Sequence, residues 1–173
     1  MFGRYQPDLD AYERRVQSGP CFVCGIVSRD PDFPKHHVVY EDDAVIAFLN
    51  RYPTQYGYTL IAPKEHKERV ADDFTLEEYL GLQRVVHQVA KAVGEEVGAE
   101  RVYLLSLGSN GGNAHVHWHV VPLPPGTPYE DQQFAAIMLE RAGAMKIPEE
   151  EIVSLAARIG RRVRKSQEMD FGG

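Results

Sequence analysis

The spacing of hydrophobic positions predicts strands in the first third of the chain. Residues 37–41, 44–50 and 57–64 are short runs rich in β-branched and aromatic side chains, separated by polar or turn-forming residues. Asp42 and Asp43 lie between the first two runs, which is typical of a hairpin turn. We therefore expect three strands here, the first two of them antiparallel.

The pattern changes to a helical period at Thr75. The Thr75 hydroxyl is placed to cap a helix, and Glu78 has the spacing that completes a capping box. Gly98 is a fitting stop at the other end. Between these limits the apolar positions recur at helical intervals, at Leu82, Val86, Val89, Val93 and Val97.

The second half of the chain alternates between the two patterns. Strand character returns at 101–108 and 114–123, whereas the prolines of 122–128 exclude regular structure there. Residues 130–143 predict a helix, and a last helix is expected from Pro148. Its apolar face would consist of Ile152, Leu155, Ala156, Ile159 and Val163. This order predicts an α+β fold, an antiparallel sheet with helices on one side, although the long helix could also join a parallel pair.

Composition narrows the class of protein. With 173 residues, 43% of them hydrophobic, the chain suits one domain with a substantial core. A net charge of −6 makes nucleic acid an unlikely partner, because nucleic-acid binders usually carry a basic surplus. The sequence has no long apolar run and no charged-then-apolar leader at Met1, so we expect a cytoplasmic protein with no membrane segment.

Three histidines alternate with apolar residues in the second half of the chain. On a strand, His115, His117 and His119 would share one face, while the residues between them would face the core. One hypothesis is a metal site, but three alternating positions span about 13 Å of backbone, which is awkward for one ion. The other is nucleophilic catalysis, in which one imidazole attacks phosphorus and its neighbours bind the phosphate oxygens.

Two cysteines, Cys21 and Cys24, are separated by two residues. This spacing fits half of a zinc site, a redox motif, or two small buried side chains. The spacing alone favours the zinc half-site without excluding the other two interpretations.

The segment HVHWHVV at 115–121 resembles the signature of the histidine triad superfamily, in which three histidines alternate with apolar residues. Other segments that precede the triad also resemble the family and occur in the family's order. They are CFVC, YEDDAVIAFLN, LIAPKEH and a Gly/Asn-rich turn directly before the triad. Together they cover about residues 20–125, which we assign as the catalytic domain. Residues 1–19 and 126–173 would then be an N-terminal extension and a C-terminal helical extension packed on the same domain.

The resemblance implies a fold, an activity and a partner. The fold would be a five-stranded, mainly antiparallel sheet with a long helix and additional terminal helices. Proteins of this family usually form homodimers. The activity would be attack on the α-phosphate of a nucleoside phosphoramidate or a dinucleoside polyphosphate, through a nucleotidyl-histidine intermediate that water hydrolyses. Alternatives are a dinucleoside polyphosphate phosphorylase or nucleotidyltransferase, and a nucleotide-binding regulatory protein with little activity. His119 favours hydrolysis, because transferring branches often have Gln there.

The resemblance also implies roles for individual residues. His117 would be the nucleophile, His119 would contact the phosphate, and Asn50 would bind the ribose hydroxyls. The base would lie in an apolar clamp made of Phe22, Val23, Ile26 and Phe48, and the phosphate-binding loop would offer Ser109, Asn110, Gly112 and Asn113. A structural Zn²⁺ would be held by Cys21, Cys24, His66 and His115.

Three features depart from the family pattern. The loop before the triad is shorter than usual, and Tyr58 stands where the family usually has His. The segment after Pro122 replaces the common ending and could close over the site through Tyr129, Gln132 or Gln133. His36 and His37 match nothing in the pattern, and we expect them at the surface.

Overall fold

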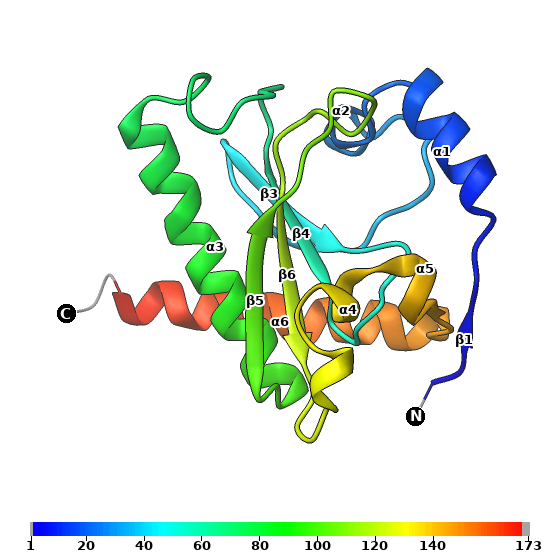
Figure 1. The fold of residues 1–173 in the computed structure, drawn as a ribbon. Coiled ribbons are helices and arrows are strands. Elements are labelled where there is room, and N and C mark those ends of the chain that lie inside the picture. Colours follow the sequence, from blue (N-terminus) through cyan, green and yellow to red (C-terminus); the bar gives the residue numbers. More distant parts are fainter. Residues whose placement is uncertain (1, 171–173) are drawn as a thin grey trace.

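In this computed structural model, which describes residues 2–170, the centre is a five-stranded sheet in the order β2-β3-β4-β6-β5 (Figure 1). The strands are β2 (Val38–Glu41), β3 (Val45–Leu49), β4 (Thr59–Pro63), β5 (Arg101–Ser106) and β6 (Trp118–Leu123). Each neighbouring pair is antiparallel, so the predicted α+β fold with an antiparallel sheet is confirmed and no parallel pair forms within this sheet.

Strand register assigns every central side chain to one of two faces. Ile61 of β4 lies opposite Trp118 of β6, and Leu60 lies opposite His119. Because side chains alternate along a strand, Trp118 and Val120 point to one face while His119 points to the other. His119 therefore shares its face with Leu60, whereas the tryptophan between the histidines packs in the core, as predicted.

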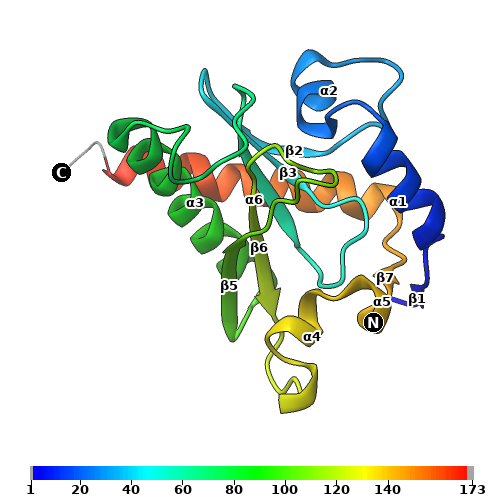
Figure 2. The same ribbon diagram turned by 45° about the horizontal axis from the view of Figure 1, so that its top comes forward.

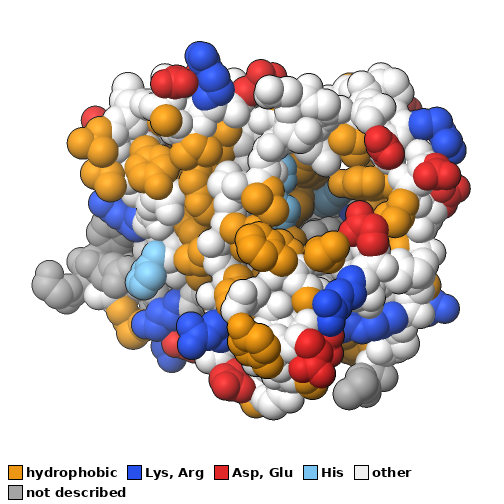
Figure 3. Space-filling model, in the orientation of Figure 1, with side chains coloured by type: hydrophobic (Ala, Val, Ile, Leu, Met, Phe, Trp, Pro, Cys, Tyr) orange, Lys and Arg blue, Asp and Glu red, His pale blue; other side chains and the backbone are white. Residues whose placement is uncertain are grey.

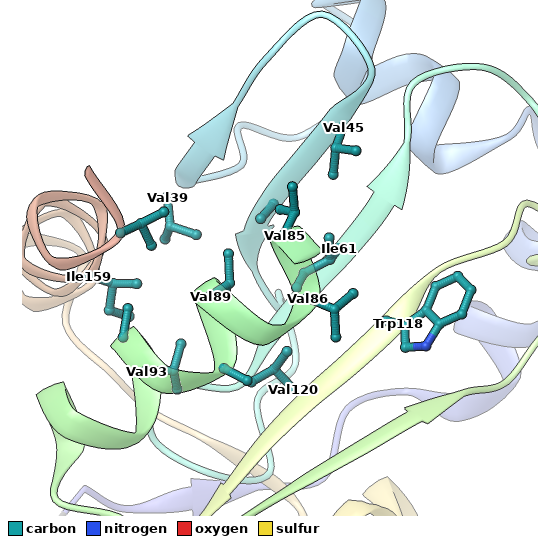
Figure 4. Close-up of a cluster of buried hydrophobic side chains, with 14 of the residues drawn as sticks. Val39, Val45, Ile61, Val85, Val86, Val89, Val93, Trp118, Val120 and Ile159 are labelled. Atoms are coloured by element: carbon teal, nitrogen blue, oxygen red, sulfur yellow. The ribbon is translucent and has the colours of Figure 1, made fainter. Parts of the chain in front are cut away.

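Two long helices cover the Trp118 face. They are α3 (Leu76–Val97), which lies at the left of the strands in Figure 1, and α6 (Glu149–Asp170), which passes behind them. Both helices contribute to the valine-rich core drawn in Figure 4. Both halves of the capping box form at the start of α3, and Gly98 ends the helix with a left-handed φ of 66°. Val89, Val93 and Ile159 are fully buried there, and each such side chain contributes about 1.5–3 kcal/mol.

The N-terminal segment packs against the segment that precedes α6 (Figure 1). A two-residue strand β1 (Arg4–Tyr5) pairs with β7 (Ala144–Met145), and α1 (Leu9–Ser18) follows β1. Met145 in turn donates its backbone N–H to the carbonyl of Pro53, which lies in the loop after β3. The two extensions are thus joined to each other and to the sheet, while the domain limits at 20 and 125 stay a prediction.

The single helix expected over 130–143 is wrong. The segment forms a 3₁₀ turn, η1 (Tyr129–Asp131), and two one-turn helices, α4 (Phe134–Ile137) and α5 (Leu139–Ala142). Gln133 has a φ of 55° and Met138 is extended, so the helical hydrogen-bond ladder is interrupted twice. Tyr129 is 78% exposed, and none of Tyr129, Gln132 and Gln133 lines the cavity described below.

The expected strand 114–123 begins only at Trp118, so His115 and His117 precede β6. The backbone N–H of Val116 donates to the carbonyl of Lys67, at 2.7 Å, instead of entering the sheet ladder. The histidines therefore do not form one continuous row on a strand, and His115 turns away from the other two.

Within residues 2–170, no helix is long and apolar enough to cross a membrane.

Candidate active site and metal centre

A cavity of about 1030 Å³ lies on the sheet face opposite α3 and α6. Its walls come from α1, from α2 (Phe22–Ser28), from the loop after β3 and from the loop before β6, which converge above the sheet in Figure 2. In Figure 3, histidine atoms are visible inside a hollow of this face. The cavity walls include residues from every predicted site segment: Cys21, Phe22, Phe48, Asn50, His66, Asn110, Gly112, Asn113, His115, His117 and His119.

His117 is held in a single orientation by its own backbone segment. Its Nδ1 lies 2.7 Å from the carbonyl oxygen of His115, so Nδ1 carries the proton and donates it. The Nε2 lone pair is then free at the opposite side of the ring. Burial lowers the pKa of His117, which is 4% exposed, and the ring rests edge-on against Phe22 at 5.5 Å between centroids. This is the arrangement that an uncharged nitrogen nucleophile needs.

His119 has a different partner, the hydroxyl of Tyr58, at 2.7 Å from Nδ1. With Tyr58 as donor, the neutral His119 carries its proton on Nε2, which is buried and has no hydrogen-bond partner. Burial, reinforced by nearby His117, lowers the pKa of His119 to about 3. Nε2 of His119 is thus a donor available to an anionic oxygen close to His117, since the two rings are 4.8 Å apart.

Aromatic side chains form one wall of the cavity. Phe22 packs edge-on against Phe48, with 6.4 Å between ring centroids, and His36 packs edge-on against the same Phe48 at 5.4 Å. His36 is half-buried and lines the cavity, so its place at the surface, which the sequence indicated, is within the cavity wall. Val23 and Ile26, expected in the base clamp, do not line the cavity and are buried at 0% and 8% exposure, because α2 turns them toward the core.

Polar groups of two loops occupy the rest of the wall. Asn50 ends the buried strand β3, and its Oδ1 accepts the backbone N–H of Tyr52 at 2.9 Å. Asn110, Gly112 and Asn113 all line the cavity. Ser109 does not, because its hydroxyl accepts the N–H of Gly111 and shapes the turn instead.

The four predicted metal ligands come together at one end of the cavity. One ligand atom from each of Cys21, Cys24, His66 and His115 lies within 4.8 Å of all the others. Nδ1 of His115 is 3.3 Å from Sγ of Cys21, and Nδ1 of His66 is 3.3 Å from Sγ of Cys24. Two sulfur atoms and two imidazole nitrogens are the donors of a closed tetrahedral zinc site, so at these separations the group could hold a metal.

Each histidine of this cluster is oriented by a second hydrogen bond. Nε2 of His115 donates to the carbonyl of Pro63 at 2.9 Å, and Nε2 of His66 lies 3.0 Å from Oε1 of Glu68. Both contacts leave Nδ1 unprotonated and turned toward the sulfur atoms, which is the usual arrangement around a bound metal. His115 is 1% exposed, whereas His66 is exposed and the two cysteines are half-buried.

Sequence reasoning missed four residues of α1 and the loop after β3 that line the cavity: Tyr12, Arg15, Arg51 and Tyr52. α1 is mostly polar and lies far from the triad in sequence, so no periodicity pointed to it. Tyr58 did leave a signal, since it occupies a position where the related sequences usually have His. That departure indicated that a contact in the site is altered, but it did not reveal that the Tyr58 hydroxyl contacts His119.

Comparison with known proteins places this arrangement in a family. Residues 34–125 match the HIT domain family. An uncharacterized HIT-like protein of Borreliella burgdorferi is 35% identical over 107 residues, which cover 59% of this chain and 74% of that protein. The adenosine 5'-monophosphoramidase of Schizosaccharomyces pombe is 32% identical over 109 residues, which cover 60% of this chain and 74% of that protein.

Solved structures share the fold. A hypothetical histidine triad nucleotide-binding protein of Sulfolobus tokodaii superimposes with a TM-score of 0.66 at 25% identity, over 84% of this chain and 93% of that one. A zinc-bound histidine triad family protein of Mycobacterium smegmatis gives a TM-score of 0.64 at 22% identity, over 86% of this chain and 96% of that one. Because the family match spans more than half of the 173 residues, this chain belongs to the HIT domain family.

Proposed function

We propose that the protein is a nucleotide hydrolase that acts at the α-phosphate of nucleoside phosphoramidates or dinucleoside polyphosphates. The observation that carries this proposal is the fixed tautomer of His117, whose Nδ1 proton is bound to the carbonyl of His115. An imidazole locked in this way presents a neutral Nε2 to the cavity and needs no separate base.

The proposed reaction has two displacement steps. In the first, Nε2 of His117 attacks the α-phosphorus, a P–N bond forms, and the bond to the leaving group breaks; an amine leaves after taking a proton from solvent, whereas a phosphate chain leaves as an anion. In the second, water attacks phosphorus and gives up a proton to solvent, the P–N bond breaks, and a nucleoside monophosphate leaves while His117 returns to its neutral form. The Nε2 donor of His119 would stabilise the negative charge on the phosphoryl oxygens in both steps.

The remaining cavity groups support a nucleotide as the substrate. Phe22 and Phe48 offer aromatic edges for a base, and Asn50 lies on the same wall, where its side chain could bind ribose hydroxyls. Asn110 and Gly112 lie on the loop that would hold the phosphate. A similar sequence, that of the Schizosaccharomyces pombe adenosine 5'-monophosphoramidase, supports phosphoramidates as one substrate class.

We further propose that the Cys21–Cys24–His66–His115 group binds structural Zn²⁺. All four positions are filled by protein side chains, which leaves no open position for substrate or water. The ion would supply folding energy rather than chemistry, and His115 would position His117 through its backbone carbonyl.

The homodimer expected from the resemblance stays a prediction. β5 is an edge strand of the sheet, and its Leu104 is 49% exposed. A second copy of the chain would satisfy the unpaired backbone groups of this edge.

Steady-state assays with adenosine phosphoramidate and diadenosine tetraphosphate test the activity. We expect adenosine monophosphate to be released, and His117→Ala to lower kcat by at least about 10³-fold. Orthophosphate should not accelerate turnover; acceleration would identify the phosphorylase alternative. Tight nucleotide binding with no turnover, equal in the wild-type protein and His117→Ala, would support the regulatory alternative and contradict the enzyme.

A further inference from the structure

The N-terminal helix α1 forms one wall of the cavity, although it lies outside the residues that match the family. Tyr12, Arg15, Val16 and Gln17 of this helix all line the cavity. Figures 1 and 2 show α1 next to the loop that precedes β6, beyond the end of the sheet. The helix thus adds side chains of its own to the site.

Two contacts fix α1 against the loop proposed to hold phosphate. Gly112 has a φ of 145°, and a Cβ at this position would lie only 2.3 Å from Cγ1 of Val16, so the helix packs directly on the glycine backbone. One residue further, the side-chain amide of Asn113 donates to the hydroxyl of Tyr12 at 3.1 Å. Arg15 directly precedes Val16 and therefore lies beside this loop.

A third contact joins α1 to the loop after β3. The Nη2 group of Arg15 donates to the hydroxyl of Tyr52 at 3.2 Å, and the rings of Tyr12 and Tyr52 pack edge-on with 5.8 Å between centroids. The guanidinium of Arg51 lies over the ring of Tyr52 at 5.5 Å. Arg15 therefore lies between the loop that carries Asn50 and the loop that carries Asn110 to Asn113.

Neither Arg15 nor Arg51 has an ion-pair partner among residues 2–170, although both line the cavity. Other cations near the site are neutralised: Lys64 pairs with Glu41, and Lys67 pairs with Glu65 and Glu78. A guanidinium has five N–H donors, and the contacts with tyrosine leave most of those of Arg15 and Arg51 unused. Two arginines that have no ion-pair partner among these residues, beside the loop proposed to hold phosphate, offer free donors to an anion.

We infer that Arg15 and Arg51 form a subsite for the phosphate groups beyond the scissile one, so that the preferred substrates carry a phosphate chain as leaving group. This inference rests on the proposed attack by His117. When a phosphoramidate reacts, the leaving group is a small neutral amine, which cannot use the arginines. With a nucleoside or dinucleoside polyphosphate, the leaving phosphates carry negative charge, and Arg15 and Arg51 stabilise that charge as it increases at bond cleavage.

The test compares substrates that differ only in the leaving group. Arg15→Gln and Arg51→Gln should each lower kcat/KM for diadenosine tetraphosphate by about 10- to 100-fold, while adenosine phosphoramidate changes by less than about twofold. ATP is the second substrate in this test, because it has a phosphate leaving group but no second nucleoside. If the variants lose as much kcat/KM with ATP as with diadenosine tetraphosphate, the arginines contact only phosphates; a smaller loss with ATP shows that they also contact the second nucleoside. Arg14→Gln is the matched control, because Arg14 lies on the same helix, does not line the cavity and should leave both activities unchanged.

A binding measurement separates this inference from the proposed hydrolysis. Inorganic tripolyphosphate, titrated calorimetrically into the intact protein, should bind about tenfold more weakly to Arg15→Gln than to Arg14→Gln, and more weakly at high salt. That result would support the subsite even if no substrate were turned over. Equal tripolyphosphate affinity in the two variants, or an equal loss of activity toward the phosphoramidate and the tetraphosphate, would overturn the inference.

Discussion

At the scale of single residues, hydrogen bonds to ring nitrogens give the neighbouring His117 and His119 different chemical roles. His117 is bonded through Nδ1 to a backbone carbonyl and offers a lone pair, while His119 is bonded through Nδ1 to Tyr58 and offers a proton. The resemblance implied a nucleophile at His117 and a phosphate contact at His119, but the sequence did not reveal the hydrogen bonds that support these roles. His117 lies outside the strand, and its partner is the backbone carbonyl of His115. The role of Tyr58 depends on the β4–β6 register, which the sequence does not reveal.

Replacing Tyr58 tests the role of His119. Tyr58→Phe keeps the ring but removes the hydrogen bond to Nδ1, so His119 can adopt the other tautomer and lose its Nε2 donor. We expect kcat to fall about tenfold with KM little changed, and stability to fall by about 1 kcal/mol. Tyr58→His, which restores a ring nitrogen at this position, should recover part of the loss. A Tyr58→Phe variant with unchanged kcat and unchanged ¹⁵N shifts of His119 would contradict this role.

At the scale of elements, the Cys₂His₂ group joins three segments that are distant in sequence. Cys21 caps α2, His66 follows β4, and His115 precedes β6. The spacing of CFVC favoured a zinc half-site but left two other interpretations open, and the tertiary placement of His66 and His115 beside the cysteines now supports the metal site. Residues 130–143 likewise predicted a single helix from their sequence. The positive φ of Gln133, which interrupts that helix, is not visible in the sequence pattern.

Removing the metal should loosen these segments selectively. Treatment with a zinc chelator, or Cys21→Ser, should lower the free energy of unfolding by about 3 kcal/mol and the Tm by about 6–12 °C, because metal-binding energy at such a site is folding energy. Hydrogen exchange should accelerate in residues 20–37 and 64–75, while the middle of α3 serves as an internal control. Protein purified with no zinc by elemental analysis, and with a Tm insensitive to both treatments, would exclude the structural metal.

At the scale of the whole molecule, ion pairs fasten the C-terminal helix to the domain. Glu96 of α3 accepts hydrogen bonds from Arg158 at 2.6 Å and from Arg162 at 2.5 Å, both on α6. The sequence predicted both helices and their apolar faces, but not that Glu96 near the end of α3 would contact Arg158 and Arg162 of α6. β1 and β7 pair with each other in a separate two-stranded sheet and so connect the N-terminal and C-terminal extensions.

The α3–α6 pairs predict a stability that depends on pH. Burial raises the pKa of Glu96, but hydrogen bonds from Arg162 and Arg158 outweigh this effect and bring the pKa below its usual value. The stabilisation is therefore complete above about pH 4.5 and is lost as pH falls through the lower folded pKa. In urea unfolding, Glu96→Gln should cost about 1–2 kcal/mol at pH 7, and this cost should shrink below pH 4.5.

The neighbouring Glu95→Gln is the control for this comparison. Glu95 is half-exposed and lies 3.6 Å from Arg162, so its loss should cost less than about 0.5 kcal/mol at any pH. A cost for Glu96→Gln that stays constant from pH 7 to pH 3 would show that the ion pairs are not its source.

Locating the covalent intermediate tests the central claim most directly. Protein mixed with adenosine phosphoramidate or diadenosine tetraphosphate would be quenched within milliseconds to seconds into mild base, digested, and mapped by peptide mass spectrometry. The structure predicts a nucleotidyl group on the peptide that contains His117, attached at that residue and absent from His117→Ala. A nucleotidyl group attached to His119, His36 or any other residue, or turnover in which no residue is ever modified, would contradict the account.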